Sequence, residues 1–272
     1  MISGNSLQTQ TAEISSSNPA VAAPLAAVHS VETFGSVDGP GIRFVIFLKG
    51  CHMRCRYCHN PDTWDGHSTD MRSADELLEQ ALRYRAYWGS KGGITVSGGE
   101  ALLQIDFMID LFKKAKKLGI HTCLDTSAQP FTRREPFFAK FNQLMQYTDL
   151  VLLDIKHIDS AEHKHLTGHG NENILDCAAY LSEIAKPVWV RHVLVPTLTD
   201  HDTRLHQLRA FLTTLHNIER IEVLPYHALG AYKWQALGIP YTLNEIESPS
   251  KERIANAERI LRGEAEQAQC PR

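Results

Sequence analysis

Short apolar runs alternate with helical patterns along most of this 272-residue chain. Runs dominated by β-branched and apolar residues predict six strands, at 42–48, 94–96, 120–124, 150–153, 188–195 and 221–224. Helical patterns follow them, at 73–88, 105–118, 134–146, 173–185, 200–215 and 250–262. This alternation implies a parallel sheet with right-handed crossovers. We therefore expect a single α/β domain, a partial (β/α)6 TIM-type barrel, with a flavodoxin-like or Rossmann sheet as the alternative.

Sequence signals at the helix ends support this division. Ser73 and Glu76 have the spacing of a capping box, which predicts that the first helix opens there and ends before Gly89. Thr199 or Asp200 is the expected N-cap of the helix at 200–215.

The first 27 residues differ from the rest of the chain. They are rich in Ser, Thr, Gln, Asn and Ala and show no hydrophobic periodicity, which predicts a disordered or loosely docked extension. The fold should begin near Val28, so that 28–272 forms one domain. The extension lacks the basic start and apolar core of a secretory signal. No apolar run in the chain is long enough to span a bilayer.

The composition is ordinary for a soluble globular protein, with 43% hydrophobic and 22% charged residues. A net charge of -3 provides no basic field that would attract nucleic acid. Six cysteines in a chain of this size do not form a secreted disulfide framework, and they fit a reducing compartment. We therefore expect a cytoplasmic protein without a nucleic-acid or membrane partner.

Three cysteines, Cys51, Cys55 and Cys58, are spaced C-x3-C-x2-C. Such closely spaced thiolates can hold zinc or an iron–sulfur cluster. Three cysteine ligands leave one coordination position open, which suggests a catalytic site. Alternatively, His59 could occupy that position and complete a structural Cys3His zinc site. A structural zinc domain is thus the non-enzymatic alternative. Two other cysteines fit small buried apolar groups and the last lies near the C-terminus: Cys123, Cys177 and Cys270.

Polar groups cluster at the ends of the predicted strands, where parallel α/β folds place their ligand sites. The cysteine loop follows the first strand, and the others are Gly98 to Glu100, Asp125, Asp154 with Lys156, Arg191 with His192, and His227. Each also has an ordinary interpretation as a turn glycine, a helix cap, a salt bridge or a loop histidine. Their shared placement at one edge favours a site.

The cysteine spacing, with Tyr57 before the last cysteine and Gly98-Gly99-Glu100 after the second strand, resembles the radical S-adenosylmethionine (SAM) enzymes. Further blocks narrow the resemblance to the activases of glycyl radical enzymes: 33–43, 57–64, 95–100, 121–126, 153–156 and 224–229. The resemblance spans about 28–262. It implies a 4Fe-4S cluster held by Cys51, Cys55 and Cys58, with SAM chelating the fourth iron.

The resemblance also implies roles for single residues. Those expected to bind the cofactor are Tyr57, Cys58, His59, Gly99, Glu100, Asp154, Ile155, Lys156 and His227. Catalytic roles are implied for Asp125, Lys156 and His227, with Asp125 near both the cofactor and an incoming peptide. We further expect Arg191 and His192 in the walls of a peptide groove over the strand ends.

The implied reaction is the reductive cleavage of SAM to a 5′-deoxyadenosyl radical, which removes a glycine Cα hydrogen from a partner enzyme under anaerobic conditions. The segment between Asn60 and Gly93 is short and lacks cysteine, which favours a partner of the pyruvate formate-lyase type. A flavodoxin or ferredoxin is the implied electron donor, and a monomer suits an enzyme that embraces a large partner. The alternative is a radical SAM enzyme that acts on another glycyl radical enzyme or a small molecule.

Overall fold

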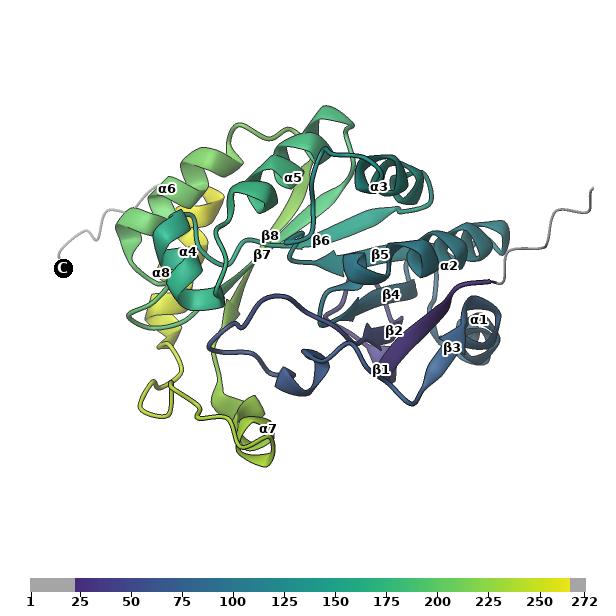
Figure 1. The fold of residues 1–272 in the computed structure, drawn as a ribbon. Coiled ribbons are helices and arrows are strands. Elements are labelled where there is room, and N and C mark those ends of the chain that lie inside the picture. Colours follow the sequence, from purple (N-terminus) through teal and green to yellow (C-terminus); the bar gives the residue numbers. More distant parts are fainter. Residues whose placement is uncertain (1–22, 265–272) are drawn as a thin grey trace, which may run out of the picture.

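The computed structural model describes residues 23–264 and shows one open eight-stranded sheet (Figure 1). The strand order is β3-β1-β2-β4-β5-β6-β7-β8, and all neighbours from β2 to β8 are parallel. The strands are β1 Leu25–Gly35, β2 Arg43–Leu48, β3 Met71–Ser73, β4 Gly93–Gly98, β5 His121–Thr126, β6 Leu150–Asp154, β7 Val188–Leu194 and β8 Ile218–Pro225. Six parallel strands in a sheet that does not close confirm the predicted partial barrel.

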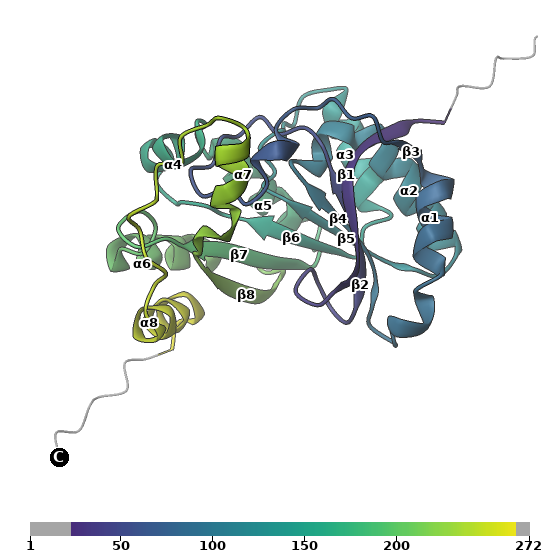
Figure 2. The ribbon, with the colours of Figure 1, turned by 90° about the horizontal axis from the view of Figure 1, so that it is seen from below.

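Helices cover the outer face of the sheet, as the view from below in Figure 2 also shows. Neighbouring crossover helices pack side by side, α1 with α2 and α2 with α3, while α6 packs with the last helix α8. The helices are α1 Ala74–Leu82, α2 Ile105–Lys117, α3 Phe137–Met145, α4 Ser160–Thr167, α5 Glu172–Glu183, α6 Asp202–Leu212, α7 Ala231–Ala236 and α8 Lys251–Arg262. None of them is long and apolar enough to cross a membrane, within the residues described.

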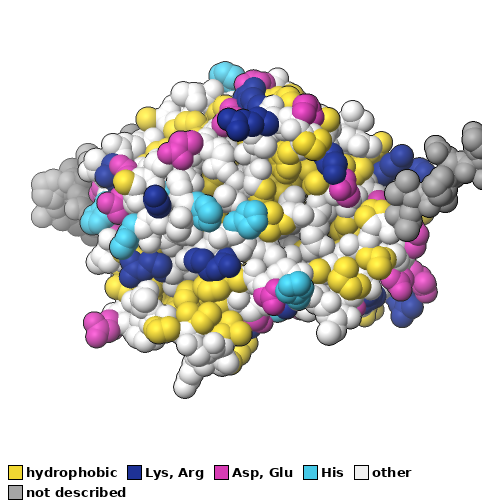
Figure 3. Space-filling view, viewed as in Figure 1, with side chains coloured by type: hydrophobic (Ala, Val, Ile, Leu, Met, Phe, Trp, Pro, Cys, Tyr) yellow, Lys and Arg dark blue, Asp and Glu magenta, His cyan; other side chains and the backbone are white. Residues whose placement is uncertain are grey.

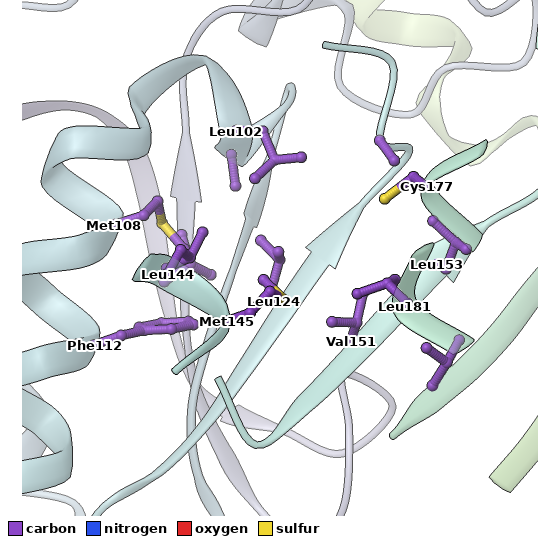
Figure 4. Packing of buried hydrophobic residues seen from close by; sticks show 14 of the residues in the cluster. Leu102, Met108, Phe112, Leu124, Leu144, Met145, Val151, Leu153, Cys177 and Leu181 are labelled. Carbon is purple, nitrogen blue, oxygen red and sulfur yellow. The ribbon is translucent and has the colours of Figure 1, made fainter. Parts of the chain in front are cut away.

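The main hydrophobic core lies between the helices and the sheet (Figure 4). Met108 and Phe112 of α2 and Leu144 of α3 pack towards Leu124 of β5, and all four side chains are completely buried. Cys177 of α5 is 1% exposed within the same cluster, which confirms that it is a small buried apolar group. The apolar stripe of each helix and the apolar side chains of each strand therefore determine which face packs in the core. The opposite face of each element points away from it.

Arg43 fills the inside of the sheet at the amino-terminal ends of the strands. Its side chain is fully buried and donates to Thr95 Oγ1 at 2.8 Å and to the carbonyl oxygens of Ile94 and Pro40. A buried guanidinium group requires such a shell of acceptors. This end of the partial barrel is thereby filled, which leaves the carboxyl ends of the strands for ligands.

The first predicted helix begins as expected but ends early. The capping box is confirmed, with Ser73 and Glu76 bonded in both directions. The α-helix ends at Leu82, and a short 3-10 turn covers part of the remaining expected length. The expected N-cap at Thr199 or Asp200 is wrong, because His201 occupies the N-cap position of α6, without a capping hydrogen bond from its side chain.

The N-terminal edge of the fold differs from the expectation. β1 begins at Leu25, before the expected start at Val28, and pairs antiparallel with both β2 and β3. Ala26 is completely buried, so this segment belongs to the fold. The sequence analysis also missed α4 and α7, both of which are short. The earlier part of the expected extension, and Cys270, lie outside the described residues.

Candidate functional site

A cavity of about 480 Å³ opens at the carboxyl ends of the parallel strands. It contains most of the residues that the sequence pattern singled out. Its walls are formed by Val37, Cys51, Met53, Cys55, Tyr57, Cys58, His59, Asn60, Thr63, Trp64, Gly98, Gly99, Ser127, Asp154, Lys156, Arg191, Val193, Leu224, Pro225 and His227. The expectation that separate strands deliver their polar ends to one place is thereby confirmed.

The cysteine loop rests directly on the end of β4. A Cβ atom added at Gly99 would lie 2.3 Å from the carbonyl oxygen of Gly50, and Gly98 has a φ of +124°. Gly99 N donates to Leu48 O, and Glu100 N donates to Gly50 O, both at 2.8 Å. The two glycines are therefore needed for the close approach of two backbones, in addition to lining the cavity.

The helix α4, which the sequence analysis missed, holds the cysteine loop from the other side. Arg54 N donates to Thr167 O at 2.7 Å, and Arg56 N donates to Leu166 O at 3.0 Å. Both carbonyl groups belong to the last turn of α4, where carbonyl oxygens lack partners within the helix. The loop between Cys51 and Cys58 is thus bound to two separate parts of the fold.

The three thiols are buried close enough to influence one another. Burial raises the pKa of Cys51 and Cys55 to about 12, and each of the three thiols raises the pKa of another. The backbone N–H groups of Met53 and Asn60 oppose this effect and lower the pKa of Cys51 and Cys58, respectively. Without a cation these thiols would stay protonated, whereas hydrogen bonds to the sulfurs and a nearby iron stabilise thiolates. The donor set therefore fits an iron–sulfur cluster.

His59 lies against the end of β8. Its ring stacks on that of His227 with centroids 4.2 Å apart, and its Nε2 atom lies 3.1 Å from the carbonyl oxygen of His227. Both histidines line the cavity. Within residues 23–264, no three His, Cys, Asp or Glu side chains are placed so that they could hold a single metal ion.

An ion pair lies in the cavity wall at the carboxyl end of β6. Lys156 Nζ lies 2.9 Å from Asp154 Oδ2 and 5.8 Å from the ring centre of Tyr57. Burial alone would raise the pKa of Asp154, but the cations of Lys156 and Arg191 outweigh it and bring the pKa below its ordinary value. Asp154 and Lys156 are therefore both charged and adjacent in the cavity wall.

Two buried polar atoms of cavity-lining residues have no hydrogen-bond partner among the described residues. They are Tyr57 Oη and His227 Nδ1, whereas the Arg191 side chain is ion-paired with Asp125 and Glu222. Buried polar atoms are costly without partners, so such atoms in a cavity indicate a polar ligand. Together with the Asp154–Lys156 pair, they fit a ligand such as SAM, which carries an amino group, a carboxylate and a sulfonium.

Three of the expected site residues lie behind the cavity wall. Glu100 is 2% exposed and accepts from Thr126 Oγ1 at 2.5 Å and from the N–H and hydroxyl of Ser127. Ile155 is completely buried, and Asp125 contacts the wall through Arg191. The roles expected for these three residues stay predictions.

The expectation that His192 forms a groove wall is wrong. Side chains alternate along a strand, so Arg191 and Val193 of β7 face the cavity and His192 faces away. His192 is 2% exposed and bonds to the carbonyl oxygens of Ile155 and Thr199. The same alternation could have identified Val193, whereas Met53, Trp64 and Ser127 lie in irregular segments that carry no such signal.

An open, mostly parallel sheet with three cysteines at its carboxyl edge defines the class of the radical SAM enzymes. The model of the Radical SAM superfamily matches residues 45–208 of this chain. The chain is 55% identical to the pyruvate formate-lyase-activating enzyme of Streptococcus mutans, over 87% of this chain and 91% of that protein. It is 49% identical to the enzyme of the same name from Listeria monocytogenes, over 87% and 96%. This chain therefore belongs to the pyruvate formate-lyase-activating enzyme family of the radical SAM superfamily.

Solved structures agree with the fold. A domain of pyruvate-formate lyase-activating enzyme from Bacteroides vulgatus covers 63% of this chain and 94% of its own, with 27% identity and a TM-score of 0.52. SuiB from Streptococcus suis, bound to its precursor peptide SuiA, covers 86% of this chain and 47% of its own, with 18% identity and a TM-score of 0.60. Family membership replaces the structural zinc domain as the interpretation of the three cysteines.

Proposed function

We propose that this chain activates pyruvate formate-lyase under anaerobic conditions by generating a glycyl radical on it. The single observation that carries the proposal is the shared cavity of Cys51, Cys55 and Cys58 with Asp154 and Lys156 at the carboxyl edge of an open sheet. The relatives at 55% and 49% identity, which are named after this activity, support the choice of partner.

The chain's own thiols would hold the 4Fe-4S cluster, and the cavity beside them would bind SAM. Such a cluster would supply the electron for reductive cleavage of SAM, the chemistry that would allow removal of a hydrogen atom from a glycine Cα. The protein contributes binding and orientation, and it keeps water and competing hydrogen donors away.

The cavity wall offers both signs of charge to a zwitterionic ligand. The ammonium group of Lys156 can attract a carboxylate, and the carboxylate of Asp154 can attract an amino group or a sulfonium. Tyr57 and His227 each contribute a buried polar atom that still lacks a partner among the described residues. We propose that these four side chains orient the ligand, together with the backbone at Gly99.

The open sheet suits a macromolecular substrate. β8 is the last strand in the sheet order and does not pair with β3, so the partial barrel stays open on that side (Figure 2). Val37 lines the cavity and is 68% exposed, which marks the side at which the cavity meets solvent. A glycine-bearing loop of a large partner could enter there and reach the strand ends. Arg191 lines the cavity and is paired at 3.3 Å with Asp125 behind it, and we propose that Asp125 acts on the incoming loop through Arg191.

The electron donor would be a flavodoxin or ferredoxin. Arg54 and Arg56 lie between the cysteines, and both are at least partly exposed. The face shown in Figure 3 presents Lys and Arg side chains near its centre, close to a group of histidines. Positive charge beside the cluster loop would attract an acidic electron carrier. We further propose that the enzyme is a cytoplasmic monomer.

An anaerobic assay tests this proposal. Reconstituted enzyme, SAM, a chemical reductant and pyruvate formate-lyase should give the electron paramagnetic resonance signal of a glycyl radical. A Cys55→Ala variant should give none. Cleavage of SAM without a glycyl radical signal would contradict the proposed partner and favour another glycyl radical enzyme or a small molecule as substrate.

A further inference from the structure

The most exposed apolar side chains of the described residues lie at the rim of the cavity. Leu229 is 75% exposed, Val37 68% and Tyr232 66%, and every other large apolar side chain that the structure describes is less exposed. Val37 lines the cavity itself. Leu229 and Tyr232 follow His227, which lines the cavity at the end of β8. We name Val37, Leu229 and Tyr232 the rim patch.

The turn that carries Leu229 packs directly against the cysteine loop. Gly230 follows Leu229, and a Cβ atom added there would lie 2.6 Å from Cα of His59, which lines the cavity. A residue with a side chain would therefore force the two backbones apart. This close approach fixes Leu229 beside the cavity wall, while its own side chain stays in solvent.

Helix α7 is bound to the cysteine loop on one face and exposed on the other. Trp234, 5% exposed, donates its indole N–H to the carbonyl oxygen of the last cluster cysteine at 2.8 Å. Lys233 Nζ lies 2.8 Å from Asn60 Oδ1. Leu229 and Tyr232 are three residues apart in consecutive helical turns, which places them on one side of the segment. They therefore form one apolar surface on a fixed support, and Figure 3 shows apolar side chains gathered over α7.

The charges near the rim patch indicate which partner would cover it. The only charged residue of the segment 228–240 is Lys233, and its ammonium group is already bound by Asn60 and Asp62. An acidic electron carrier finds no free cation on this segment. A protein that places a glycine in the cavity must cover the rim of that cavity. Exposed apolar side chains at such a position are typical of a protein-binding surface.

We propose that the rim patch is the docking surface for pyruvate formate-lyase, and that it binds an uncharged, apolar surface of that protein next to the reactive glycine. The inference rests on the proposed function, because it takes the partner protein from there. Leu229 and Tyr232 would contribute apolar area that is removed from water only when the whole partner is bound. Since α7 is already held by the cysteine loop, little conformational entropy is lost on docking.

Binding of whole pyruvate formate-lyase tests the inference. Reconstituted enzyme with SAM, but without a reductant, can bind the partner without turnover. The double variant Leu229→Ala, Tyr232→Ala should raise the dissociation constant about tenfold. The matched control is Leu118→Ala, Tyr87→Ala, which removes side chains that are 42% and 59% exposed and do not line the cavity. Equal dissociation constants for the two double variants, or no binding by the unaltered enzyme, would overturn the inference.

A short peptide that contains the reactive glycine separates docking from chemistry. The peptide reaches the cavity without covering α7, so both double variants should form a glycyl radical on it as fast as the unaltered enzyme. With the whole partner, KM of the Leu229→Ala, Tyr232→Ala variant should rise about tenfold at an unchanged kcat. An equal loss with peptide and with whole protein would overturn the docking role. If the unaltered enzyme binds pyruvate formate-lyase but forms no glycyl radical, the proposed function fails while the docking surface stands.

A photochemical cross-link identifies the occupant without removing the patch. Replacing Tyr232 with p-benzoylphenylalanine keeps an aromatic side chain on the exposed face of α7. Illumination should link this chain to pyruvate formate-lyase, whereas the same replacement at Tyr87 should not. Links only to a second copy of this chain, or only to a flavodoxin added to the mixture, would overturn the inference.

Discussion

Arg191 of β7 reaches across β6 to Asp125 of β5, with Nη1 3.3 Å from Oδ2, and each side chain is 12% exposed. Ser97 Oγ of β4 donates to the same carboxylate oxygen at 2.7 Å. Three strands, β4, β5 and β7, are therefore joined through Asp125 behind the cavity. Burial raises the pKa of Asp125, and Arg191 opposes that effect. This pair is a link between the sheet and the site.

Replacing Arg191 with Leu should lower the free energy of unfolding at pH 7 by about 3 kcal/mol, because it leaves a buried carboxylate without its cation. The loss should depend on pH. The pKa of Asp125 lies above 3.8 in the folded protein, so the folded state binds the proton more tightly than the unfolded state. The group's contribution to stability is thus present below pH 3.8 and is lost as the pH rises through the raised pKa.

Without Arg191 that pKa rises further, so the deficit of the variant should shrink as the pH falls from 7. Urea unfolding of the protein without cofactors, measured across this range, checks both the size and the sign. Arg220→Leu is the matched control, since Arg220 is 56% exposed beside Glu222. It should cost less than about 1 kcal/mol. A deficit in Arg191→Leu that is equal at every pH would contradict the assignment to Asp125.

Cys55→Ala should abolish the cluster while the protein stays folded. Cys55 is 8% exposed in the loop that follows β2, and its thiol has the other two cysteine ligands as neighbours. Cys177→Ala removes another buried thiol, 1% exposed, from the core between helices and sheet, and should leave the cluster intact. Iron content and visible absorbance after anaerobic reconstitution report the difference. Equal iron in both variants would mean that Cys55 is not a ligand.

Glu100→Ala should destabilise the fold more than it weakens cofactor binding. The carboxylate accepts from the backbone N–H groups of Leu102 and Ser127, at 3.1 and 3.0 Å, and both would lose their acceptor. We expect a loss of about 2 kcal/mol or more in urea unfolding. Glu79→Ala, at a 76% exposed side chain, should change little. A large loss of SAM affinity with unchanged stability would instead show that Glu100 binds the cofactor directly.

Much of the site could be predicted because a parallel sheet gathers its strand ends at one edge. The cysteines, Asp154, Lys156 and His227 were found by their position directly after apolar runs, and the structure brings them to one cavity. Regular strands also made the order of the six parallel strands predictable from chain order alone.

The missed features share a different cause. α4 and α7 are short, and they are stabilised by contacts with the cysteine loop that lies far away in sequence. β1 pairs antiparallel at the edge of the sheet, and its partners β2 and β3 follow it in the chain. Glu100 was expected at the cofactor because the family resemblance implied that role. The hydroxyl groups of Thr126 and Ser127 that bind it come from another strand end, and no local pattern reveals them.

The boundary of the fold gives the last prediction. The sequence pattern alone predicts that removal of residues 1–27 leaves SAM cleavage intact. In the structure, however, the backbone of Ala27 is hydrogen-bonded to the segment that precedes the cysteine loop. Ala27 N donates to Gln104 Oε1 at 2.9 Å, Ala27 O accepts from Lys49 N at 2.9 Å, and Leu25 pairs with Ser73. Lys49 lies two residues before the first cluster cysteine, so losing this contact should loosen the start of the cysteine loop. Removal of residues 1–22 should leave thermal stability and SAM cleavage unchanged, whereas removal of 1–27 should lower both. Equal behaviour of the two truncations would show that the β1–β3 pairing contributes nothing to the site.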